Sequence, residues 1–204
     1  MKSGLLVVIS GPAGVGKGSI VKEMMKLSDK VVLSVSATTR APRPDERDGI
    51  NYFFKSREQF EEMIRNNELI EWVEYCGNYY GTPKEFVMSE IEKGHIVILE
   101  IEVEGAASVK RLFPDSVLCF VLPPDYYELE KRLRGRGTED EETINRRLTR
   151  AREEFRHIDD YDYIIINDTI SSAAQRFMNI IESEQMKTHR NKELINKFKN
   201  IGSD

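Results

Sequence analysis

A glycine-rich segment with a single lysine is the part of this sequence best suited to bind phosphate. It follows the apolar run Leu5–Ser10 and consists of Gly11, Pro12, Ala13, Gly14, Val15, Gly16, Lys17, Gly18 and Ser19. Glycines let successive backbone N–H groups curl around phosphate oxygens, and the N-terminus of a following helix adds a positive partial charge. Lys17 adds a full charge for the β- and γ-phosphates. This arrangement predicts a nucleoside triphosphate site.

The segment departs from the usual phosphate-loop pattern at one position. That pattern has Ser or Thr directly after the lysine, whereas here Gly18 intervenes and Ser19 supplies the hydroxyl. One residue turns a side chain by about 100° around a helix, so it stays open whether Ser19 contacts magnesium directly, through water, or contacts only phosphate. An ordinary strand–helix turn is the plainer alternative. The G-x-G-x-x-G spacing of a dinucleotide site is absent.

A second pair of cations lies further along the chain. Arg40 and Arg43 are separated by three positions, with Pro42 and Pro44 stiffening the turn. Two arginines can hold one phosphate through forked hydrogen bonds. Without other evidence, such charges usually belong to a solvated loop.

One carboxylate falls within an apolar run and could recognise a purine. In the predicted strand Leu69–Cys76, Glu71 shares a face with Leu69, Val73 and Tyr75. Guanine presents two adjacent donors, N1–H and the 2-amino group, which match the two oxygens of an ionised carboxylate, whereas adenine presents an acceptor at N1. The wrong base would leave the carboxylate unpaired, which can discriminate by about 10⁴-fold. The alternative is a carboxylate at the rim of an exposed strand.

Five short apolar runs predict the strands that position these groups. They are Leu5–Ser10, Val31–Ser36, Ile96–Ile101, Val117–Leu122 and Tyr163–Asn167. Helical stretches separate them, beginning with Lys17–Leu27, and this alternation predicts an α/β fold with a parallel sheet covered on both faces. The connection from Ser36 to Ile96 spans about sixty residues, too long for a simple crossover, and predicts an inserted subdomain.

Capping patterns predict where several helices begin and end. Ser56 with Gln59 forms a capping box before a helix that turns Phe60, Met63 and Ile64 inward. A second helix is expected from an N-cap at Thr82, with Pro83 in its first turn, and is expected to stop at Gly94. A third is expected from Thr138 to Ile158, and the tail from Ser171 to Lys199 is expected to form one closing helix.

The third of these helices carries a cluster of cations. Nine basic residues lie in and before it: Lys131, Arg132, Arg134, Arg136, Arg146, Arg147, Arg150, Arg152 and Arg156. The apolar arc of the helix is made by Ile144, Leu148, Ala151, Phe155 and Ile158. Arg147 lies about 60° from the centre of this arc and can face a site, whereas Arg146 and Arg150 are expected to point away into solvent.

Taken together, these motifs are similar in order and spacing to those of the guanylate kinase family, from about Leu5 to Asp168. The segments that carry the resemblance are the glycine-rich loop, Ser34–Pro44, Gly49–Phe54, Glu71-Trp72, Gly77–Thr82 and Gly135–Glu139. The resemblance implies a three-layer P-loop NTPase core with a five-stranded parallel sheet (1–33, 96–125 and 159–204), an inserted GMP-binding domain (34–95) and a helical lid (126–158). It also implies transfer of the γ-phosphoryl group of ATP to GMP, and to dGMP, with Mg²⁺ bound to ATP.

Roles for individual residues follow from the same resemblance. The residues matching those that hold the GMP phosphate are Arg40, Arg43, Tyr52 and Tyr80, and those matching the guanine-reading residues are Ser36, Glu71 and Thr82. Glu100 stands at the carboxyl end of a strand, where the family often has Asp, and is expected between GMP and magnesium; its division of labour with Glu102 stays open. Lys17, Arg132, Arg136 and Arg147 are expected around the transferring phosphoryl group, and Asn167 near adenine.

Composition limits the other functions that the chain could have. The 204 residues are 40% apolar and 32% charged, which is typical of one globular unit with insertions. The net charge of −5 disfavours a nucleic-acid binder, and the five-residue run Leu5–Ile9 is far shorter than the roughly 20 residues that span a bilayer. The cysteines Cys76 and Cys119 and the histidines His95, His157 and His189 lack metal-ligand spacing. We therefore expect a cytoplasmic protein without a metal held by side chains alone.

Two rival functions stay open from the sequence. A binding module of guanylate-kinase shape would keep the fold without phosphate chemistry, although the intact Lys17 loop and the basic lid argue against it. Another nucleoside monophosphate kinase is also open, because Gly18 and Ser19 resemble the Gly-Lys-Gly-Thr form of adenylate kinases. The sequence leaves the oligomeric state undecided.

Overall fold

The core of the protein is a parallel sheet of five strands. The computed structural model describes residues 4–75, 77–135 and 140–201. The strands run in the order β2-β7-β1-β8-β9, with bounds β1 (Leu5–Ser10), β2 (Val31–Leu33), β7 (Ile96–Glu100), β8 (Val117–Leu122) and β9 (Tyr163–Ile166). The predicted parallel sheet is confirmed. Strand β2 ends before the predicted Ser36, because the chain turns there toward a second sheet that it enters at Ala37.

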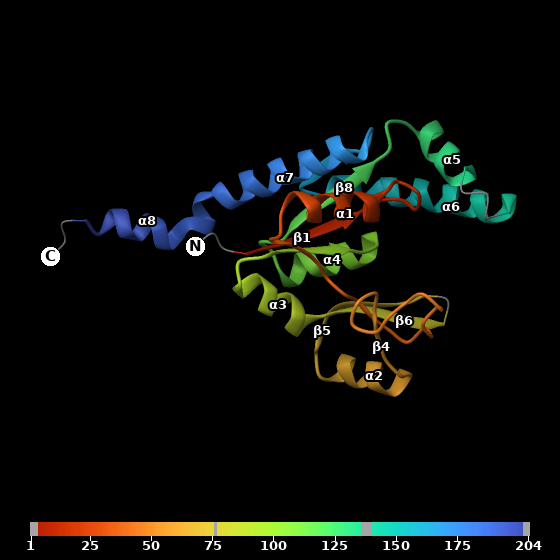
Figure 1. The fold of residues 1–204 in the computed structure, drawn as a ribbon, viewed down its shortest axis with the longest axis horizontal. Coiled ribbons are helices and arrows are strands. Elements are labelled where there is room, and N and C mark those ends of the chain that lie inside the picture. Colours follow the sequence, from red (N-terminus) through yellow and green to blue (C-terminus); the bar gives the residue numbers. More distant parts are fainter. Residues whose placement is uncertain (1–3, 76, 136–139, 202–204) are drawn as a thin grey trace.

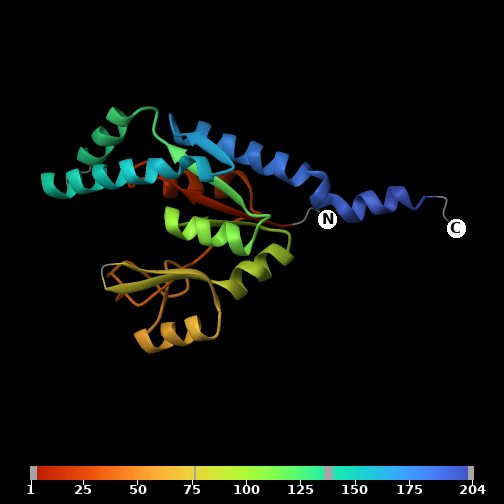
Figure 2. The same cartoon turned by 180° about the vertical axis from the view of Figure 1, so that it is seen from behind.

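Helices cover both faces of this sheet. All six residues of β1 are buried: Leu5, Val7 and Ile9 pack with helices on one face, and Leu6 and Val8 with helices on the other. Figures 1 and 2 show α1 and α7 on one side of the sheet and α3 and α4 on the opposite side. The helix bounds are α1 (Lys17–Leu27), α3 (Lys84–Glu92), α4 (Val103–Leu112), α5 (Tyr126–Arg134), α6 (Glu141–Glu154) and α7 (Ile170–Met186). Burial on both faces explains why the strands are continuously apolar.

The long connection after β2 builds a second, mixed sheet. Its order is β4-β3-β6-β5, with bounds β3 (Ala37–Thr38), β4 (Phe53–Phe54), β5 (Leu69–Tyr75) and β6 (Asn78–Pro83), and helix α2 (Arg57–Arg65) packs on it. A small core of its own forms around Ala37, Phe60 and Tyr79. Strand β5 has a register shift between Leu69 and Trp72, which interrupts the alternation of its side chains.

The capping predictions had mixed outcomes. The capping box of Ser56 and Gln59 is confirmed at the start of α2, with Phe60 buried beneath it. Thr82 is not an N-cap: α3 begins at Lys84 after Pro83, because the Thr82 hydroxyl donates its hydrogen bond to Glu71 instead. Thr138 lies outside the described residues, and Asp140 caps α6 by accepting from the backbone of Thr143.

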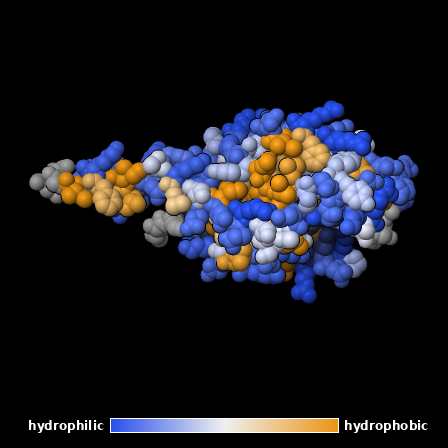
Figure 3. All heavy atoms as spheres, turned by 90° about the horizontal axis from the view of Figure 1, so that it is seen from above, coloured by the Kyte–Doolittle hydropathy of each residue, from blue (hydrophilic) through white to orange (hydrophobic). Residues whose placement is uncertain are grey.

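The C-terminal tail is not the single helix that the sequence predicts. Helix α7 ends at Met186, because Lys187 adopts a ψ of 136° that leaves the helical region. A 3₁₀ turn, η2 (Thr188–Asn191), and a short helix, α8 (Lys192–Lys199), follow. Figures 1 and 3 show α8 extending away from the body, with apolar side chains on its surface; Leu194 and Phe198 are exposed. Among the described helices, none has the length and apolar character to span a membrane.

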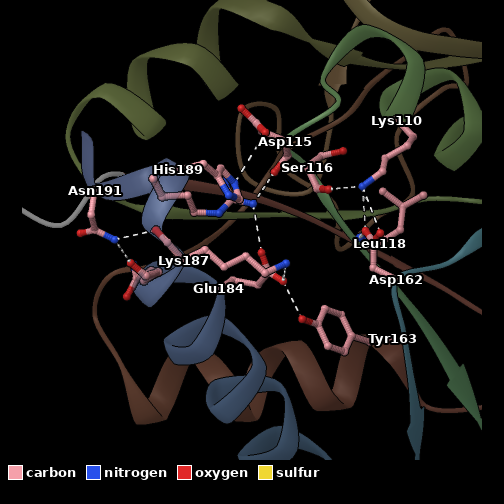
Figure 4. A network of polar contacts seen from close by, with 12 residues as sticks. Lys110, Asp115, Ser116, Leu118, Asp162, Tyr163, Glu184, Lys187, His189 and Asn191 are labelled. Carbon is pink, nitrogen blue, oxygen red and sulfur yellow. Dashed lines mark hydrogen bonds and ion pairs between the residues drawn. The ribbon is translucent and has the colours of Figure 1, made fainter. Parts of the chain in front are cut away.

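A buried carboxylate fastens the end of α7 to the core. Glu184 accepts hydrogen bonds from Tyr163 Oη at 2.6 Å and from Arg190 Nη2 at 3.1 Å, and its side chain is only 2% exposed. Lys187 Nζ lies 2.6 Å from Oε1, the oxygen that also accepts from Tyr163, and Figure 4 shows Tyr163 and Lys187 converging on this carboxylate. Arg190 also donates to the backbone oxygen of Asp115, so the tail is tied to the loop before β8.

This cluster predicts acid-sensitive stability. Burial by itself would raise the pKa of Glu184, but the hydrogen bonds from Lys187, Tyr163 and Arg190 outweigh it and lower the pKa below the ordinary value. The stabilisation is therefore fully present above the unfolded pKa of about 4.3 and is lost as the pH falls through the folded value. We expect Glu184→Gln to lower the free energy of unfolding at pH 7 by about 2 kcal/mol, measured by urea denaturation.

The difference between the wild-type protein and Glu184→Gln should shrink as the pH is lowered from 7 toward 3. Glu182→Gln, at an exposed position on the same helix, is the matched control and should change the unfolding free energy little. A deficit in Glu184→Gln that stays constant across this pH range would contradict the assigned ionisation.

Candidate active site

The glycine-rich loop joins β1 to α1 in a conformation that depends on its glycines. Gly14 has a φ of 88° and Gly16 a φ of 99°, both in the left-handed region that favours glycine. A Cβ on Gly16 would lie 2.5 Å from Asn167 Nδ2, so a larger residue would displace that side chain. The spacing of the glycines in the sequence therefore corresponds to real backbone constraints at the start of α1.

Two polar side chains from segments distant in the sequence donate hydrogen bonds to the backbone of this loop. Asn167 Nδ2 donates to the backbone oxygen of Val15 at 2.7 Å, and Val15 itself is fully buried. Arg132 from α5 donates to the same oxygen at 3.4 Å and to the backbone oxygen of Asn167 at 3.0 Å. The structure thus brings Arg132 and Asn167, both predicted as site residues, against the loop.

Lys17 and Ser19 stand at the opening of the loop. Lys17 Nζ donates to the backbone oxygen of Gly11 and lies 3.5 Å from that of Pro12, so its ammonium group stays within the loop. Ser19 is exposed in the first turn of α1. Between them, a Cβ on Gly18 would lie 3.4 Å from Glu100 Oε2, which shows how closely the end of β7 approaches the loop.

The surroundings of Glu100 raise the pKa of its carboxyl group. Loss of solvation raises the pKa of the Glu100 carboxyl, and the charge of Lys17 opposes this rise, whereas the charge of Glu102 adds to it. A carboxyl group with a raised pKa at the carboxyl edge of a parallel sheet is typical of a ligand site.

A cleft of about 1140 Å³ separates the main sheet from the second sheet and α6. It is open enough to admit a small molecule of nucleotide size. Its walls come from three parts of the chain: the β7–α4 junction from Glu100 to Gly105; Ser36, Tyr52, Glu71 and Tyr80 of the second sheet; and Arg147, Arg150 and Glu154 of α6. Five residues predicted to bind GMP, namely Ser36, Tyr52, Glu71, Tyr80 and Glu100, therefore line one cleft.

Glu71 is the buried carboxylate of this cleft. The register shift in β5 lets Ile70 enter the core while the next residue, Glu71, turns to the cleft with only 9% of its surface exposed. Thr82 Oγ1 donates to Glu71 Oε1 at 2.7 Å, and a Cβ on Gly105 of α4 would lie 3.1 Å from Oε2. Burial raises the pKa of the Glu71 carboxyl, and the hydrogen bonds from Thr82 oppose this rise.

The predicted phosphate-holding residues are only partly brought together. Tyr52 and Tyr80 meet edge to face with ring centroids 6.1 Å apart, and the Arg40 guanidinium lies 5.4 Å from the Tyr52 ring centroid. Glu46 accepts two hydrogen bonds from Arg40, at 2.8 and 2.9 Å, and orients it. Arg43 is exposed and, among the described residues, is not part of the cleft wall.

The predicted orientations on α6 are right for one arginine and wrong for two. Arg147 lines the cleft as expected, but so do Arg146 and Arg150, which the sequence placed in solvent. Arg150 is paired with Glu102 across the cleft at 3.5 Å. The cleft borders one side of the apolar arc, so side chains that point well away from the arc can still face the cleft. Arg136 lies outside the described residues.

Three further residues, which the motifs in the sequence did not indicate, shape the site. Gly105 gives Glu71 its space, Glu46 orients Arg40, and Glu154 is a carboxylate buried beside Arg150. Only Glu154 had a signal in the sequence, since it follows Arg150 by four positions and lies close to the apolar arc. The other two depend on contacts between distant segments.

Among the described residues, no three or more His, Cys, Asp or Glu side chains cluster so that they could hold a metal by themselves. The oxygen donors near the loop are the Ser19 hydroxyl and the Glu100 carboxylate. Magnesium is commonly held by one or two carboxylates together with substrate phosphates, so these hard donors suit an ion that arrives with a nucleotide.

Several known proteins with similar sequences, and one with a similar solved structure, are guanylate kinases. A sequence model described as guanylate kinase matches residues 3–184. The guanylate kinase of Streptococcus thermophilus is 52% identical over 202 residues, covering 98% of this chain and 95% of that protein, and that of Halalkalibacterium halodurans is 51% identical over 197 residues, covering 97% and 95%. The crystal structure of guanylate kinase from Anaplasma phagocytophilum superimposes with a TM-score of 0.74 at 34% identity, covering 93% of this chain and 90% of that chain.

The contact between Thr82 and Glu71 predicts a measurable ionisation change. Thr82→Val removes the donor to Oε1 while keeping the side-chain shape, so we expect the pKa of Glu71 to rise further above its ordinary value. A carbon-detected NMR titration of the side-chain carboxyls, with Glu71→Gln to assign the signal, would measure it.

Thr38→Val is the matched control, because Thr38 is equally buried but donates to the backbone oxygen of Tyr79. It should leave the pKa of Glu71 in place. An unchanged or lower Glu71 pKa in Thr82→Val would show that this hydrogen bond does not stabilise the carboxylate.

Proposed function

The chain belongs to the guanylate kinase family, and from this premise we propose how its residues divide the work of the reaction. The protein is an ATP:GMP phosphotransferase: it transfers the γ-phosphoryl group of ATP to GMP and releases ADP and GDP. The observation that carries the division of roles is the cleft that has the buried Glu71 carboxylate on one wall and Glu100, beside the phosphate loop, on another.

Glu71 selects the base of the acceptor. Its carboxylate accepts hydrogen bonds from N1–H and the 2-amino group of guanine, and Ser36 and Thr82 complete the recognition. The Thr82 hydroxyl keeps Oε1 in place, which supports this role because an oriented carboxylate loses less freedom when the base binds. Adenine would leave the buried carboxylate without donors, and this is costly. We propose dGMP as a second acceptor, because the residues assigned above bind the base and the phosphate of GMP and not its ribose.

Cations and tyrosines hold the acceptor phosphate. Tyr52 and Tyr80 offer hydroxyl donors from the cleft wall, and Arg40 approaches from behind Tyr52 with its fork oriented by Glu46. Arg43 joins them from its exposed position. This group places the phosphate of GMP near Glu100, whose raised pKa suits a position between two anionic substrates.

The glycine-rich loop binds the donor. The backbone N–H groups of residues 13–16 and the N-terminus of α1 surround the phosphates of ATP, and Lys17 leaves the loop carbonyls to pair with the β- and γ-phosphates. Arg132, Arg136 and Arg147 neutralise charge on the group in transfer. A single well-placed arginine contributes roughly 10³–10⁵ in rate. The acceptor phosphate is already anionic, so direct in-line transfer needs no strong general base.

Magnesium bound with ATP fits the donors near the loop. Ser19 and Glu100 would hold the ion, directly or through water, and it would supply positive charge to the phosphates. Residues 34–95 act as the GMP-binding domain and residues 126–158 as the lid over the core. Their closure excludes water, which would otherwise compete with GMP as acceptor.

The first test removes the charge at the loop. Lys17→Ala should abolish turnover in a coupled assay for ADP, because the transferring group loses its principal cation. The fold should persist, since within the described part of the chain the ammonium group donates hydrogen bonds to loop carbonyls alone. Lys26→Ala, on the same helix and paired with Glu23, is the control and should keep full activity. Wild-type turnover in folded Lys17→Ala would contradict the mechanism, and a wild-type protein that formed no ADP from ATP and GMP would favour a binding module.

The second test concerns the base. Glu71→Gln should lower kcat/KM for GMP by about 10³–10⁴-fold, because the amide cannot accept both donors of guanine. AMP should stay a poor substrate for both proteins. Glu74→Gln, which changes an exposed position on the same strand, is the control. Undiminished use of GMP by Glu71→Gln, or preference of the wild-type protein for AMP, would instead favour another nucleoside monophosphate kinase.

A further inference from the structure

A short chain of ionic contacts joins α6 to the core, and none of the roles above uses it. Glu154 is the last residue of α6, and its side chain is 9% exposed. Its Oε1 accepts a hydrogen bond from Arg150 Nε at 3.1 Å. Its Oε2 is buried and has no hydrogen-bond partner within the part of the chain that the structure describes. A buried carboxylate that is only half satisfied is costly and is typical of a functional role.

Arg150 connects this carboxylate to the opposite side of the cleft. Its Nη2 reaches Glu102 Oε2 at 3.5 Å. Glu102 precedes the first turn of α4 and lies two positions after Glu100, so it belongs to the core, whereas Glu154 and Arg150 belong to α6. The guanidinium group therefore bridges two carboxylates from separate parts of the molecule.

The two ends of this bridge differ in strength. The pair of Arg150 and Glu154 lies within one helix, at four positions, with the carboxylate almost fully buried. The Glu102 side chain is 54% exposed, and its contact with Arg150 is long. Exposed ion pairs are weak and buried ones are strongly affected when one partner is removed. Glu154 thus holds Arg150 firmly, and the contact of Arg150 with Glu102 is the one that can be released.

Both the position in the chain and the electrostatics connect Glu154 to catalysis. The α-helix ends at Glu154, and the 3₁₀ helix η1 (Phe155–Asp160) begins at the next residue, so Glu154 lies at the C-terminal end of the helix that carries Arg147. Burial raises the pKa of Glu154, and the charge of Glu102 adds to this rise, whereas Lys17 and Arg150 oppose it. The charge of Lys17 in the phosphate loop is therefore one of those that favour the ionised form of Glu154.

We propose that Glu154 is a positioning residue that orients Arg150 against Glu102, so that the base of α6 is fastened to the β7–α4 junction and Arg147 is held over the transferring phosphoryl group. The proposal rests on the function proposed above for Arg147, which lies on α6 one turn before Arg150. The lid and the core are thus joined by a reversible ionic contact, in which the buried carboxylate belongs to the lid.

The kinetic test uses Glu154→Gln and Arg150→Lys in the full-length protein. Glutamine loses the charge that holds the guanidinium group, and lysine lacks the fork that reaches two carboxylates. Each variant should lower kcat by about tenfold or more, the size expected for a lost charge-assisted hydrogen bond, with KM for GMP within about twofold of wild type. The double variant should be no worse than either single one, because both act through the same bridge.

Glu142→Gln, an exposed substitution in the first turn of the same helix, is the matched control and should keep wild-type kcat. A kcat within about twofold of wild type in Glu154→Gln would overturn the proposal, as would losses that multiply in the double variant. A rise in KM for GMP without a change in kcat would also overturn it, because that pattern belongs to acceptor binding.

A second measurement does not depend on the reaction. Amide hydrogen exchange in the substrate-free protein should be faster over residues 141–153 in Glu154→Gln and in Arg150→Lys than in wild type, with α1 unchanged. Unaltered exchange over α6 would contradict the fastening even if turnover fell. Conversely, a wild-type protein that formed no ADP from ATP and GMP would overturn the proposed function, while the exchange result would still decide whether Glu154 fastens the helix.

Discussion

The six residues from Glu100 to Gly105, where β7 ends and α4 begins, impose the constraint on which the rest of the site depends. Glu100 approaches the phosphate loop at Gly18, Glu102 pairs with Arg150 of α6, and Gly105 borders the carboxylate of Glu71. Because β7 is a central strand of a buried parallel sheet and α4 packs on that sheet, this junction cannot shift without disturbing the core. The phosphate loop, the second sheet and α6 are therefore all positioned by contacts with one rigid segment at the carboxyl edge of the sheet.

The cleft contains buried carboxylates that receive only part of the hydrogen bonds that they can accept from the protein. Glu71 receives one hydrogen bond from Thr82, and Glu154 receives one from Arg150, while burial raises the pKa of both carboxyls. Buried charges of this kind destabilise a fold unless partners compensate for the lost solvation. At Glu71, the donors of the bound base can supply that compensation, which links the cost in the free protein to selectivity in the complex.

Local patterns in the sequence predicted local structure well, and contacts between distant segments poorly. Apolar runs located all five strands of the main sheet, and the Ser56 capping box located the start of α2, because each depends on neighbouring residues. Thr82 was mistaken for a cap, since its sequence context fits one equally well, and only the pairing of β5 with β6 places its hydroxyl beside Glu71. The orientation of Arg150 failed for a similar reason: a helical wheel gives angles around an axis but not the position of the opposing wall.

The contrast between Gly18 and Gly105 shows why some of the site could be recognised before the fold was known. Gly18 departs from the usual phosphate-loop pattern, but it directly follows Lys17, so its neighbours in sequence place it at the site even though its contact with Glu100 is remote. Gly105 lies inside a helix, where glycine is unfavourable by roughly 1 kcal/mol relative to alanine, and nothing adjacent to it explains that choice. The explanation is the Glu71 carboxylate, which a side chain at this position would crowd. Glycine at this position lowers the stability of α4, but it leaves the space in which the base-selecting carboxylate of Glu71 is held. A local loss of stability in the core is therefore the condition for recognising the acceptor.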